Sequence, residues 1–421
     1  MTMNKCWTPA VTMMLTAAFL LTASPASRSA EAANASMRNA SGPPAEVLCG
    51  LDILKRDNYK LLEGQRVAII TNHTGRDRDG NRLVDLLVKA PNVKVVKLFS
   101  PEHGLYGALD EHVGDTVDEA TRLKVFSLYG KTRRPSAEML EGVDTIVFDI
   151  QDIGARFYTY VATMGFAMEE AAKHKIRVVV LDRPNPITGL AVDGPINDRS
   201  ERLFTGYGPL PVMHGMTVGE LAHMFNKEYE INCDLKVVQV EGWRRAMWWD
   251  ETGLTWVNPS PNMRNLTQAT LYPAVGLIEA TNVSVGRGTD QPFELLGAPW
   301  VDGQKLSALL NAAQLPGLRF VPIEFTPTSS KFAKQACQGV YIIVTDRNAL
   351  QTIRSGLTIG WALKTLGGDK FEVDKIDNLL FNKQVLKAVK TSDRPETLPN
   401  LWREPLEAFM KVRAKYLIYP E

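Results

Sequence analysis

The sequence predicts an α/β protein with a doubly wound, mainly parallel sheet, followed along the chain by a second α/β region. Short apolar, β-branched runs alternate with amphipathic runs between residues 64 and 185, a rhythm typical of βαβ units. A loop-rich stretch over 242–300, dense in Trp, Pro, Asn and Gly, interrupts this rhythm, which resumes near residue 303. We therefore expect one domain over 46–265 and a second over 266–421.

The elements of the first domain follow from the spacing of its apolar residues. Apolar runs predict strands at 67–70, 93–100, 123–129, 145–150, 177–181 and 235–240, and helices at 83–89, 159–173 and 217–229. In the second of these helices the apolar residues recur on one face: Val161, Met164, Met168 and Ala171. Thr217 and Glu220 form a capping box that starts the third.

The second region carries the same two kinds of pattern. Helices are expected at 303–314, 348–365 and 405–415, and strands at 318–325 and 339–344.

Composition excludes two broad classes of protein. The chain has 421 residues, of which 45% are hydrophobic and 23% charged, so it is not a wholly disordered chain. Lys and Arg total 48 against 47 Asp and Glu, for a net charge of +1. The basic excess typical of a nucleic-acid-binding protein is therefore missing, and we expect no nucleic-acid partner.

The N-terminus has the pattern of a secretory signal peptide. Lys5 precedes an apolar stretch over 11–21, which is shorter than the roughly 20 residues that span a bilayer as a helix. Small residues follow it, with candidate cleavage sites near Ala26 and Ala32. We expect a signal peptide over 1–32, a flexible leader over 33–45, and an exported protein, periplasmic or secreted, without a stable membrane anchor after cleavage.

The cysteines do not form a recognisable framework. Of the four in the chain, Cys6 lies in the expected signal peptide, which leaves Cys49, Cys233 and Cys337. No two of them have the C-x-x-C spacing of a zinc or redox motif. One disulfide with one free thiol, or three separate buried thiols, are both compatible with this count.

Polar residues follow three of the expected strands, and in open parallel sheets ligands bind at the carboxyl ends of the strands. Glu102 follows the strand at 93–100, between Pro101 and His103. A carboxyl group in a partly desolvated cleft suits general acid catalysis, so Glu102 is the foremost candidate. His103 is expected to orient Glu102 or to bind the substrate.

Arginines and amides offer a binding site for an anionic or polar ligand. Arg156 and Arg183 can hold a carboxylate through paired hydrogen bonds, or can instead pair with the aspartates around them. His214 is expected to face the same cleft. Asn, Ser and Arg cluster among Gly and Pro at 258–263 and 279–288, which suits a sugar subsite. Tryptophans in or near these loops can form sugar platforms or belong to the core: Trp243, Trp248, Trp249, Trp256 and Trp300.

Several common catalytic motifs are missing. There is no Walker A sequence and no H-E-x-x-H sequence, and Gly286-Arg287-Gly288 lacks the third glycine of a dinucleotide fingerprint. Ser284 does not lie in a G-x-S-x-G elbow. The acids and histidines over 102–115 match no known ligand spacing, so we expect no metal and no cofactor.

Long motifs identify a family resemblance that runs from about residue 47 to the C-terminus. They are TNHTG (71–75), FSPEHGLYG (99–107), FDIQDIGARFYTY (148–160), LDRPNP (181–186), PVMHGMTVGEL (211–221), PSPNM (259–263) and EATNVSVGRGTDQPFELLGAPW (279–300). Together they resemble the DUF1343 family, which includes the NamZ-like exo-β-N-acetylmuramidases. The resemblance implies a Rossmann-like N-terminal domain, a smaller C-terminal α/β domain and a cleft between them.

The resemblance also implies an activity, the release of N-acetylmuramic acid from the non-reducing end of peptidoglycan fragments. The substrates would be muropeptides or other glycans that end in N-acetylmuramic acid. The glutamate of the family's PEHG motif is Glu102 here. His73 and Val285 stand where we expect Gln and Glu, so a carboxylate near Arg287 is expected to be missing.

Glycoside hydrolysis needs a second group besides the acid. Asp149 or Asp152 is expected to act as base or nucleophile, unless the substrate's acetamido group assists. Arg156, Arg183 or Arg287 is expected to pair with the lactyl carboxylate of the sugar. The full set of expected substrate contacts is Asn72, His103, Gln151, Arg156, Tyr158, Asp182, Arg183, Asn185, His214, Asn262, Asn282 and Arg287.

Two alternatives to this enzyme stay open. One is a non-catalytic periplasmic protein that binds muropeptides, and the other is a metal-dependent esterase or deacetylase.

Overall fold

A computed structural model describes residues 1–2, 46–107 and 114–421. The signal peptide and leader expected over 1–45 lie, apart from the first two residues, outside the described residues, as does the acidic segment 108–113. None of the helices in the described ranges has the length and apolar character needed to cross a bilayer. Residues Glu46–Glu421 form one unit, which is described below.

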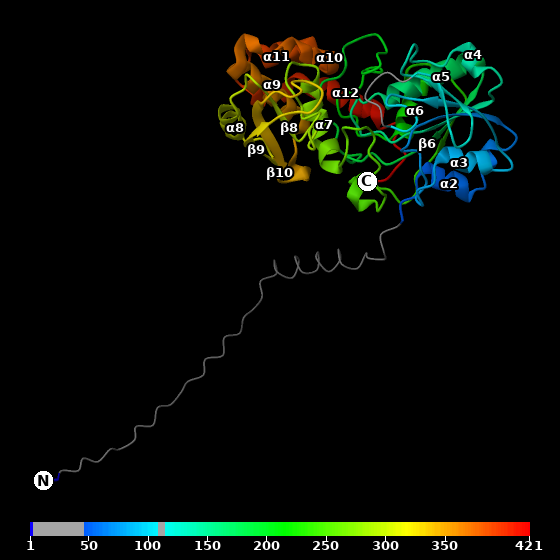
Figure 1. Cartoon of the computed structure of the whole chain (residues 1–421), viewed down its shortest axis with the longest axis horizontal. Helices are drawn as coiled ribbons and strands as arrows, with labels where there is room; N and C mark the ends of the chain where they lie inside the picture. The colour runs from blue at the N-terminus through cyan, green and yellow to red at the C-terminus, as the bar shows by residue number, and fades with distance from the viewer. Residues whose placement is uncertain (3–45, 108–113) are drawn as a thin grey trace. The chain divides into compact units, whose positions relative to one another are not determined.

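The first half of this unit is built on a seven-stranded, mainly parallel sheet, as the apolar runs predict (Figure 1). Its strands lie in the order β3-β4-β2-β1-β5-β6-β7, and only the β3–β4 pair is antiparallel. Their bounds are β1 Arg66–Thr71, β2 Lys94–Ser100, β3 Thr116–Val117, β4 Lys124–Ser127, β5 Thr145–Asp149, β6 Arg177–Leu181 and β7 Leu235–Val238. Strand β5 is buried along its whole length, which explains its unbroken apolar sequence.

Helices cover both faces of this sheet (Figure 1). They are α2 Gly50–Arg56, α3 Leu83–Lys89, α4 Ala137–Leu140, α5 Tyr160–His174 and α6 Val218–Glu228, with a short 3-10 helix η1 at Lys60–Leu62. Alternate residues of β1 face opposite ways: Ile69 packs in the core with α2 and α3, whereas Ile70 packs in the core with α4, α5 and α6. The doubly wound arrangement is therefore confirmed.

The chain order around β1 creates a crevice at one edge of the sheet. β1 lies between β2 and β5, so the connections leave it on opposite sides. Such a switch point opens a crevice outside the carboxyl ends of the strands, where ligands bind in doubly wound sheets. The loops that follow β1, β2 and β5 all begin at this place.

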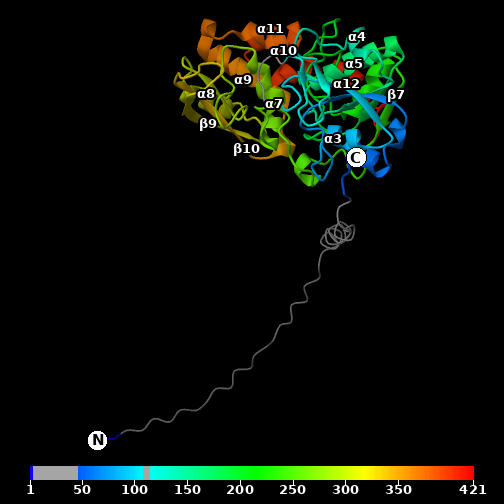
Figure 2. The same cartoon turned by 45° about the vertical axis from the view of Figure 1, so that its right-hand side comes forward.

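The second half is smaller and contains a three-stranded antiparallel sheet in the order β8-β10-β9 (Figure 2). Its strands are β8 Leu295–Ala298, β9 Leu318–Phe325 and β10 Cys337–Val344. The helices around it are α7 Leu266–Glu279, α8 Gly303–Ala312, α9 Thr352–Gly367, α10 Asp377–Leu380, α11 Lys383–Thr391 and α12 Arg403–Arg413. Short 3-10 helices complete it: η3 Arg347–Ala349, η4 Gly368–Lys370, η5 Val373–Ile376 and η6 Pro395–Leu401, whereas η2 Trp249–Glu251 belongs to the first half and precedes α7.

Helix α7 lies where the sequence predicts loops, so that expectation is wrong for residues 266–279. The helix contains Pro273 and is buried on all sides from Gln268 to Ile278. A helix buried all round has no polar face, so its sequence lacks the amphipathic period, and an internal proline further disguises it. Asn265 caps the helix by accepting a hydrogen bond from the Gln268 amide.

The last residues of the chain return to the first sheet. The Tyr419 hydroxyl donates a hydrogen bond of 2.5 Å to Asp182, the residue that follows β6. Arg413, in the last turn of α12, donates hydrogen bonds to the carbonyls of Gly189, His214 and Gly215. The C-terminal tail is thus part of the first half of the molecule.

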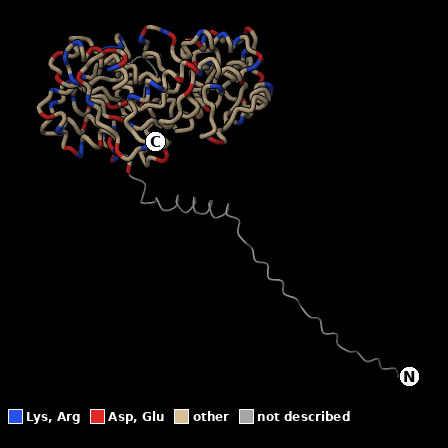
Figure 3. The backbone as a smooth tube through the Cα atoms, turned by 180° about the vertical axis from the view of Figure 1, so that it is seen from behind, with Lys and Arg blue, Asp and Glu red and all other residues tan. Residues whose placement is uncertain are grey.

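Charges of both signs are interspersed along both halves of the described chain, in keeping with its small net charge (Figure 3). Cys49, Cys233 and Cys337 are three separate buried thiols.

Candidate active site

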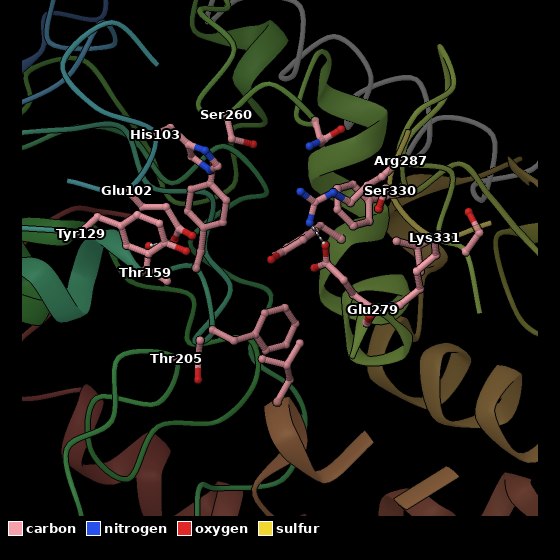
Figure 4. A pocket seen from close by; sticks show the side chains of 18 residues that line it. Glu102, His103, Tyr129, Thr159, Thr205, Ser260, Glu279, Arg287, Ser330 and Lys331 are labelled. Atoms are coloured by element: carbon pink, nitrogen blue, oxygen red, sulfur yellow. Dashed lines mark hydrogen bonds and ion pairs between the residues drawn. The ribbon is translucent and has the colours of Figure 1, made fainter. Parts of the chain in front are cut away.

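A cavity of about 360 Å³ opens between the carboxyl edge of the large sheet and the start of the second half (Figure 4). The segments that line it are the loops after β2, β4 and β6, the residues before α5, the loop before α7, α7 itself, two loops of the second half and α10. Their side chains are Glu102, His103, Tyr129, Phe157, Tyr158, Thr159, Thr205, Ser260, Asn262, Tyr272, Glu279, Ser284, Val285, Arg287, Phe293, Ser330, Lys331 and Leu379.

Glu102 lies on one wall of this cavity, held by two hydroxyl groups (Figure 4). The Thr159 hydroxyl, immediately before α5, donates a hydrogen bond of 2.6 Å to Glu102 Oε2. Burial and a hydrogen bond to Glu102 raise the pKa of Tyr129 to about 12, so this phenol keeps its proton at neutral pH. His103 follows in the left-handed conformation (φ 68°), which turns the chain sharply after Glu102.

The opposite wall carries three charged side chains: Glu279, Arg287 and Lys331 (Figure 4). Glu279 is the last residue of α7, and its carboxylate forms an ion pair of 2.7 Å with Arg287. The Lys331 ammonium donates a hydrogen bond to the backbone carbonyl of Glu279. The two walls therefore differ in charge, one with a single carboxylate and the other with two cations and one carboxylate.

Aromatic rings line the space between these walls. Tyr272 makes edge contacts with Tyr158 and Phe293, with ring centres 5.7 and 4.7 Å apart, and a tilted contact with Phe157. Rings of this kind offer an apolar surface with polar tips, as a sugar ring with an acetyl group requires.

Five of the residues predicted from the sequence line this cavity: Glu102, His103, Tyr158, Asn262 and Arg287. Sequence reasoning missed their neighbours Tyr129, Thr159, Glu279 and Lys331. Thr159 and Glu279 belong to the motifs that carry the family resemblance, so the sequence offered a reason to consider them. Lys331 lies outside all of these motifs.

Asp149 and Arg183 do not reach the cavity. They form a buried ion pair, with Arg183 Nε 2.5 Å and Nη2 3.0 Å from the Asp149 carboxylate oxygens. Arg183 also donates to the carbonyl of Arg76, and Asp149 is 0% exposed. Because the two side chains bind each other in the core, Asp149 is not a candidate for the base or nucleophile. For the same reason Arg183 is not a candidate for binding the lactyl carboxylate.

Asp152 and His214 are likewise absent from the lining of the cavity. Both are buried, and His214 Nε2 is 3.8 Å from Asp152 Oδ2. Asp152 accepts a hydrogen bond from the Gly154 amide, and burial raises its pKa to about 7. Burial lowers the pKa of His214 to about 3, so this ring is neutral. Neither of the expected roles, base for Asp152 and cleft ligand for His214, matches this placement.

Arg156 and Asp182 make hydrogen bonds that stabilise the fold. The Arg156 guanidinium is buried and donates to the carbonyls of Pro195, Leu210, Leu379 and Leu380, which ties the two halves together. Asp182 accepts hydrogen bonds from Tyr419, from Thr217 and from the Gly219 amide at the start of α6. Neither side chain is available to a sugar.

The predicted amide ligands likewise bind backbone or neighbouring side chains. The Asn72 carbonyl oxygen accepts from Thr74, and the Gln151 amide donates to the carbonyls of Asp152 and Pro184. Asn185 links Met216 and Ile187, and Asn282 links Lys370 and Glu372. These four residues shape the loops around the cavity without lining it.

The tryptophans do not provide the sugar platform that the sequence suggests, because the cavity lining within the described chain contains none of them. Trp243, Trp248 and Trp249 are buried, and Trp249 packs edge-on against Trp256. Within the described ranges, no group of three or more His, Cys, Asp or Glu side chains is arranged to hold a metal ion.

Known proteins match this chain over almost its whole folded length. Family models described as the N-terminal and C-terminal parts of the exo-β-N-acetylmuramidase NamZ match residues 67–267 and 270–419. The chain belongs to the NamZ family.

Three relatives support this assignment. The peptidoglycan β-N-acetylmuramidase NamZ of Bacillus subtilis is 42% identical over 395 residues, which cover 93% of this chain and 95% of the relative. The crystal structures of two DUF1343 family proteins of Bacteroides fragilis superpose with TM-scores of 0.83 and 0.74, at 36% and 30% identity. Each comparison covers 90% of this chain and 100% of the other.

The expected departure at residue 285 has a different outcome in the structure. The NamZ resemblance predicts that a carboxylate near Arg287 is missing, because Val285 replaces it. Val285 is buried and lines the cavity, but Glu279 supplies a carboxylate to Arg287 from helix α7. Residue 285 thus brings no carboxylate to Arg287, and the carboxylate beside this guanidinium comes from Glu279.

Proposed function

We propose that this chain hydrolyses the glycosidic bond of a terminal, non-reducing N-acetylmuramic acid, with Glu102 as the general acid. The observation that carries the assignment of Glu102 is its position: it faces the cavity and is oriented by the hydroxyl groups of Thr159 and Tyr129. The family relationship supports the reaction, since the Bacillus subtilis relative is named a peptidoglycan β-N-acetylmuramidase. Muropeptides and glycans that end in N-acetylmuramic acid are the proposed substrates.

In this mechanism Glu102 protonates the leaving oxygen while positive charge develops on the sugar ring. The second group must come from the cavity or from the substrate. Among the described lining residues Glu279 is the other carboxylate, and it is already ion-paired with Arg287. We assign the second role to the acetamido oxygen of the substrate, which predicts retention of the anomeric configuration in the product.

The site of action follows from the substrate and the N-terminus. Peptidoglycan lies outside the cytoplasmic membrane, and residues 1–32 have the pattern of a secretory signal peptide. An exported enzyme, periplasmic or secreted, meets both conditions. Cleavage of a tagged full-length chain on export, located by N-terminal sequencing, tests this.

Two disaccharides of opposite order test the reaction and its direction. N-acetylmuramic acid β-linked to N-acetylglucosamine is expected to yield both free sugars, whereas the reverse disaccharide is expected to stay intact. Cleavage of the reverse disaccharide alone would indicate a glucosaminidase and would contradict the proposal. NMR of the first-formed product reports the anomeric outcome.

The same assay separates the alternatives. Saturable binding of the disaccharide with no product on long incubation would indicate a binding protein. Loss of activity with a chelator and its recovery with a divalent ion would indicate a metal-dependent hydrolase.

A further inference from the structure

We propose that Lys331, together with Arg287, binds the lactyl carboxylate of the substrate and so selects N-acetylmuramic acid over N-acetylglucosamine. The two sugars differ in the lactyl ether on O3, so a site that tells them apart must recognise this group. The inference rests on the proposed muramidase function and adds to it the residues that decide specificity.

Lys331 is placed as an anion-binding group. It lines the cavity, is half-buried, and lies on the wall opposite Glu102 (Figure 4). Its ammonium has three donors, one of which goes to the Glu279 carbonyl at the end of α7. Burial lowers the pKa of Lys331, as expected for a cation that is partly desolvated. A carboxylate at this place would restore the interactions that the ammonium loses from water.

The charges on the two walls suit two groups of the sugar, the lactyl carboxylate and the glycosidic oxygen. Among the described residues that line the cavity, Arg287 and Lys331 exceed Glu279 by one positive charge on the far wall. Glu372 is close enough to influence Lys331 but does not line the cavity. A carboxylate on the far wall would leave the glycosidic oxygen of the same sugar directed toward Glu102.

The two loops that carry these cations are fixed to each other. Gly288, next to Arg287, adopts φ 81°, and a Cβ atom there would lie 2.4 Å from the Ser329 carbonyl oxygen. The Thr328 amide and hydroxyl both donate to the Gly288 carbonyl at 2.8 Å. Arg287 and Lys331 therefore form a preformed pair, as binding without a large ordering cost requires.

Other arginines near the sheet edge do not compete for this role. Arg156 donates to four backbone carbonyls and Arg183 pairs with Asp149, both outside the cavity lining. Within the described chain, Arg287 and Lys331 are thus the arginine and the lysine that line the cavity.

The test compares two chromogenic substrates on the full mature enzyme. Lys331→Met is expected to lower kcat/KM for 4-nitrophenyl β-N-acetylmuramide by about 10- to 100-fold, the effect of losing one charged hydrogen bond. kcat/KM for the corresponding glucosaminide is expected to stay within about twofold, since that sugar has no carboxylate. Lys334→Met, an exposed lysine of the same loop, is the matched control and should change neither value.

Competitive inhibition measures binding of the lactyl group separately from cleavage of the glycosidic bond. Lys331→Met should weaken inhibition by free N-acetylmuramic acid but not by its neutral lactyl methyl ester. Lys331→Arg should restore binding of the acid, because a cation is present again. Lys331→Gln keeps a donor for the Glu279 carbonyl and replaces the Met variant if that variant does not fold.

The outcomes separate this inference from the proposed function. A wild-type enzyme that leaves the muramide intact would refute the function itself. A wild-type enzyme that cleaves it, with equal losses on both substrates or no loss in Lys331→Met, would refute only the role of Lys331. A selective loss on the muramide, with the acid but not the ester bound more weakly, supports it.

Discussion

Carboxylates at the carboxyl ends of three strands of one sheet differ in whether they reach the cavity. Glu102, beyond the end of β2, faces the cavity, whereas Asp149, at the end of β5, and Asp182, just after β6, are 0% exposed. Pro101 and the left-handed turn at His103 carry the chain away from the sheet, while the two aspartates still lie among neighbouring strands. A carboxylate at the edge of the sheet is thus held by neighbouring side chains, as Asp149 is by Arg183 and Asp182 is by Tyr419. A carboxylate two residues beyond its strand, as Glu102 is, faces the cavity.

Glu102→Gln is expected to have the largest effect on activity of the substitutions considered, because Glu102 is the carboxylate that faces the cavity. Loss of the proton donor is expected to lower kcat on N-acetylmuramic acid β-linked to N-acetylglucosamine, whose leaving oxygen must be protonated, by roughly 10²- to 10⁴-fold. The fold should be unaffected, because the hydroxyls of Thr159 and Tyr129 can bond the amide. Thermal unfolding gives the check on structure, and Glu119→Gln, an exposed glutamate nearby, is the control for the substitution. Near-normal turnover in Glu102→Gln would remove this residue from the mechanism.

Arg183→Met should have the opposite profile, with a large loss of stability. It leaves the Asp149 carboxylate buried without its partner, which typically costs about 3–5 kcal/mol of unfolding free energy. Urea denaturation measures this loss. Arg66→Met is the matched control, because its ion pair with Asp144 is exposed to water and its loss should change stability far less. Equal losses in both variants would show that burial does not distinguish the two pairs.

Asp152→Asn tests whether the buried acid carries a proton. Burial raises the pKa of Asp152 from 3.8 to about 7, so between these values the folded state holds a proton that the unfolded state has released. Asp152 should therefore contribute a fall in the unfolding free energy as pH rises from about 4 to about 7, by an amount on the order of a few kcal/mol. The difference in unfolding free energy between the wild type and Asp152→Asn should change by this amount over the same pH range.

The control for this prediction is Asp144→Asn. Arg66 lowers the pKa of Asp144 to about 2, so this group is ionised in both states above pH 5 and adds no slope there. Urea denaturation of wild type and both variants at pH 5 and pH 8 provides the comparison. Parallel pH dependence in wild type and Asp152→Asn would mean that Asp152 is ionised in the folded protein throughout.

Thr159→Val should give the smallest of these effects. The variant keeps the shape of the side chain and removes the hydroxyl that orients Glu102, so kcat is expected to fall by about tenfold. Thr159→Ser restores the hydroxyl and should recover most of the activity. A Ser variant as slow as the Val variant would indicate that packing, not the hydrogen bond, is what Thr159 provides.

The pattern of apolar runs was sufficient to predict most of the fold. Parallel strands buried on both faces have sequences that can hardly be mistaken, as in β5 and β6. Helix α7 could not be predicted in the same way, because it is buried on every side and contains Pro273. Local pattern is informative where an element has two different faces or an unbroken apolar run, and it fails where tertiary contacts alone decide the conformation.

The site was predictable only in part, for a related reason. Glu102 has a distinctive local sequence, but an arginine after a strand looks the same whether it meets a ligand or, as with Arg156, backbone carbonyls. Lys331 has no signal in its own neighbourhood. Its place beside Arg287 depends on the packing of the 328–331 segment against Gly288, which no spacing along the chain reveals.

The bond between Tyr419 and Asp182 has a consequence for how the molecule folds. These residues are 237 positions apart, yet their contact lies at the end of a strand in the first sheet. Asp182 also caps the start of α6, so this corner needs both the middle and the end of the chain. The hydrogen bonds of this corner therefore cannot all form until residue 419 has been synthesised and has left the ribosome. Contacts this far apart close slowly, so we expect the edge that carries the active site to be among the last parts to fold.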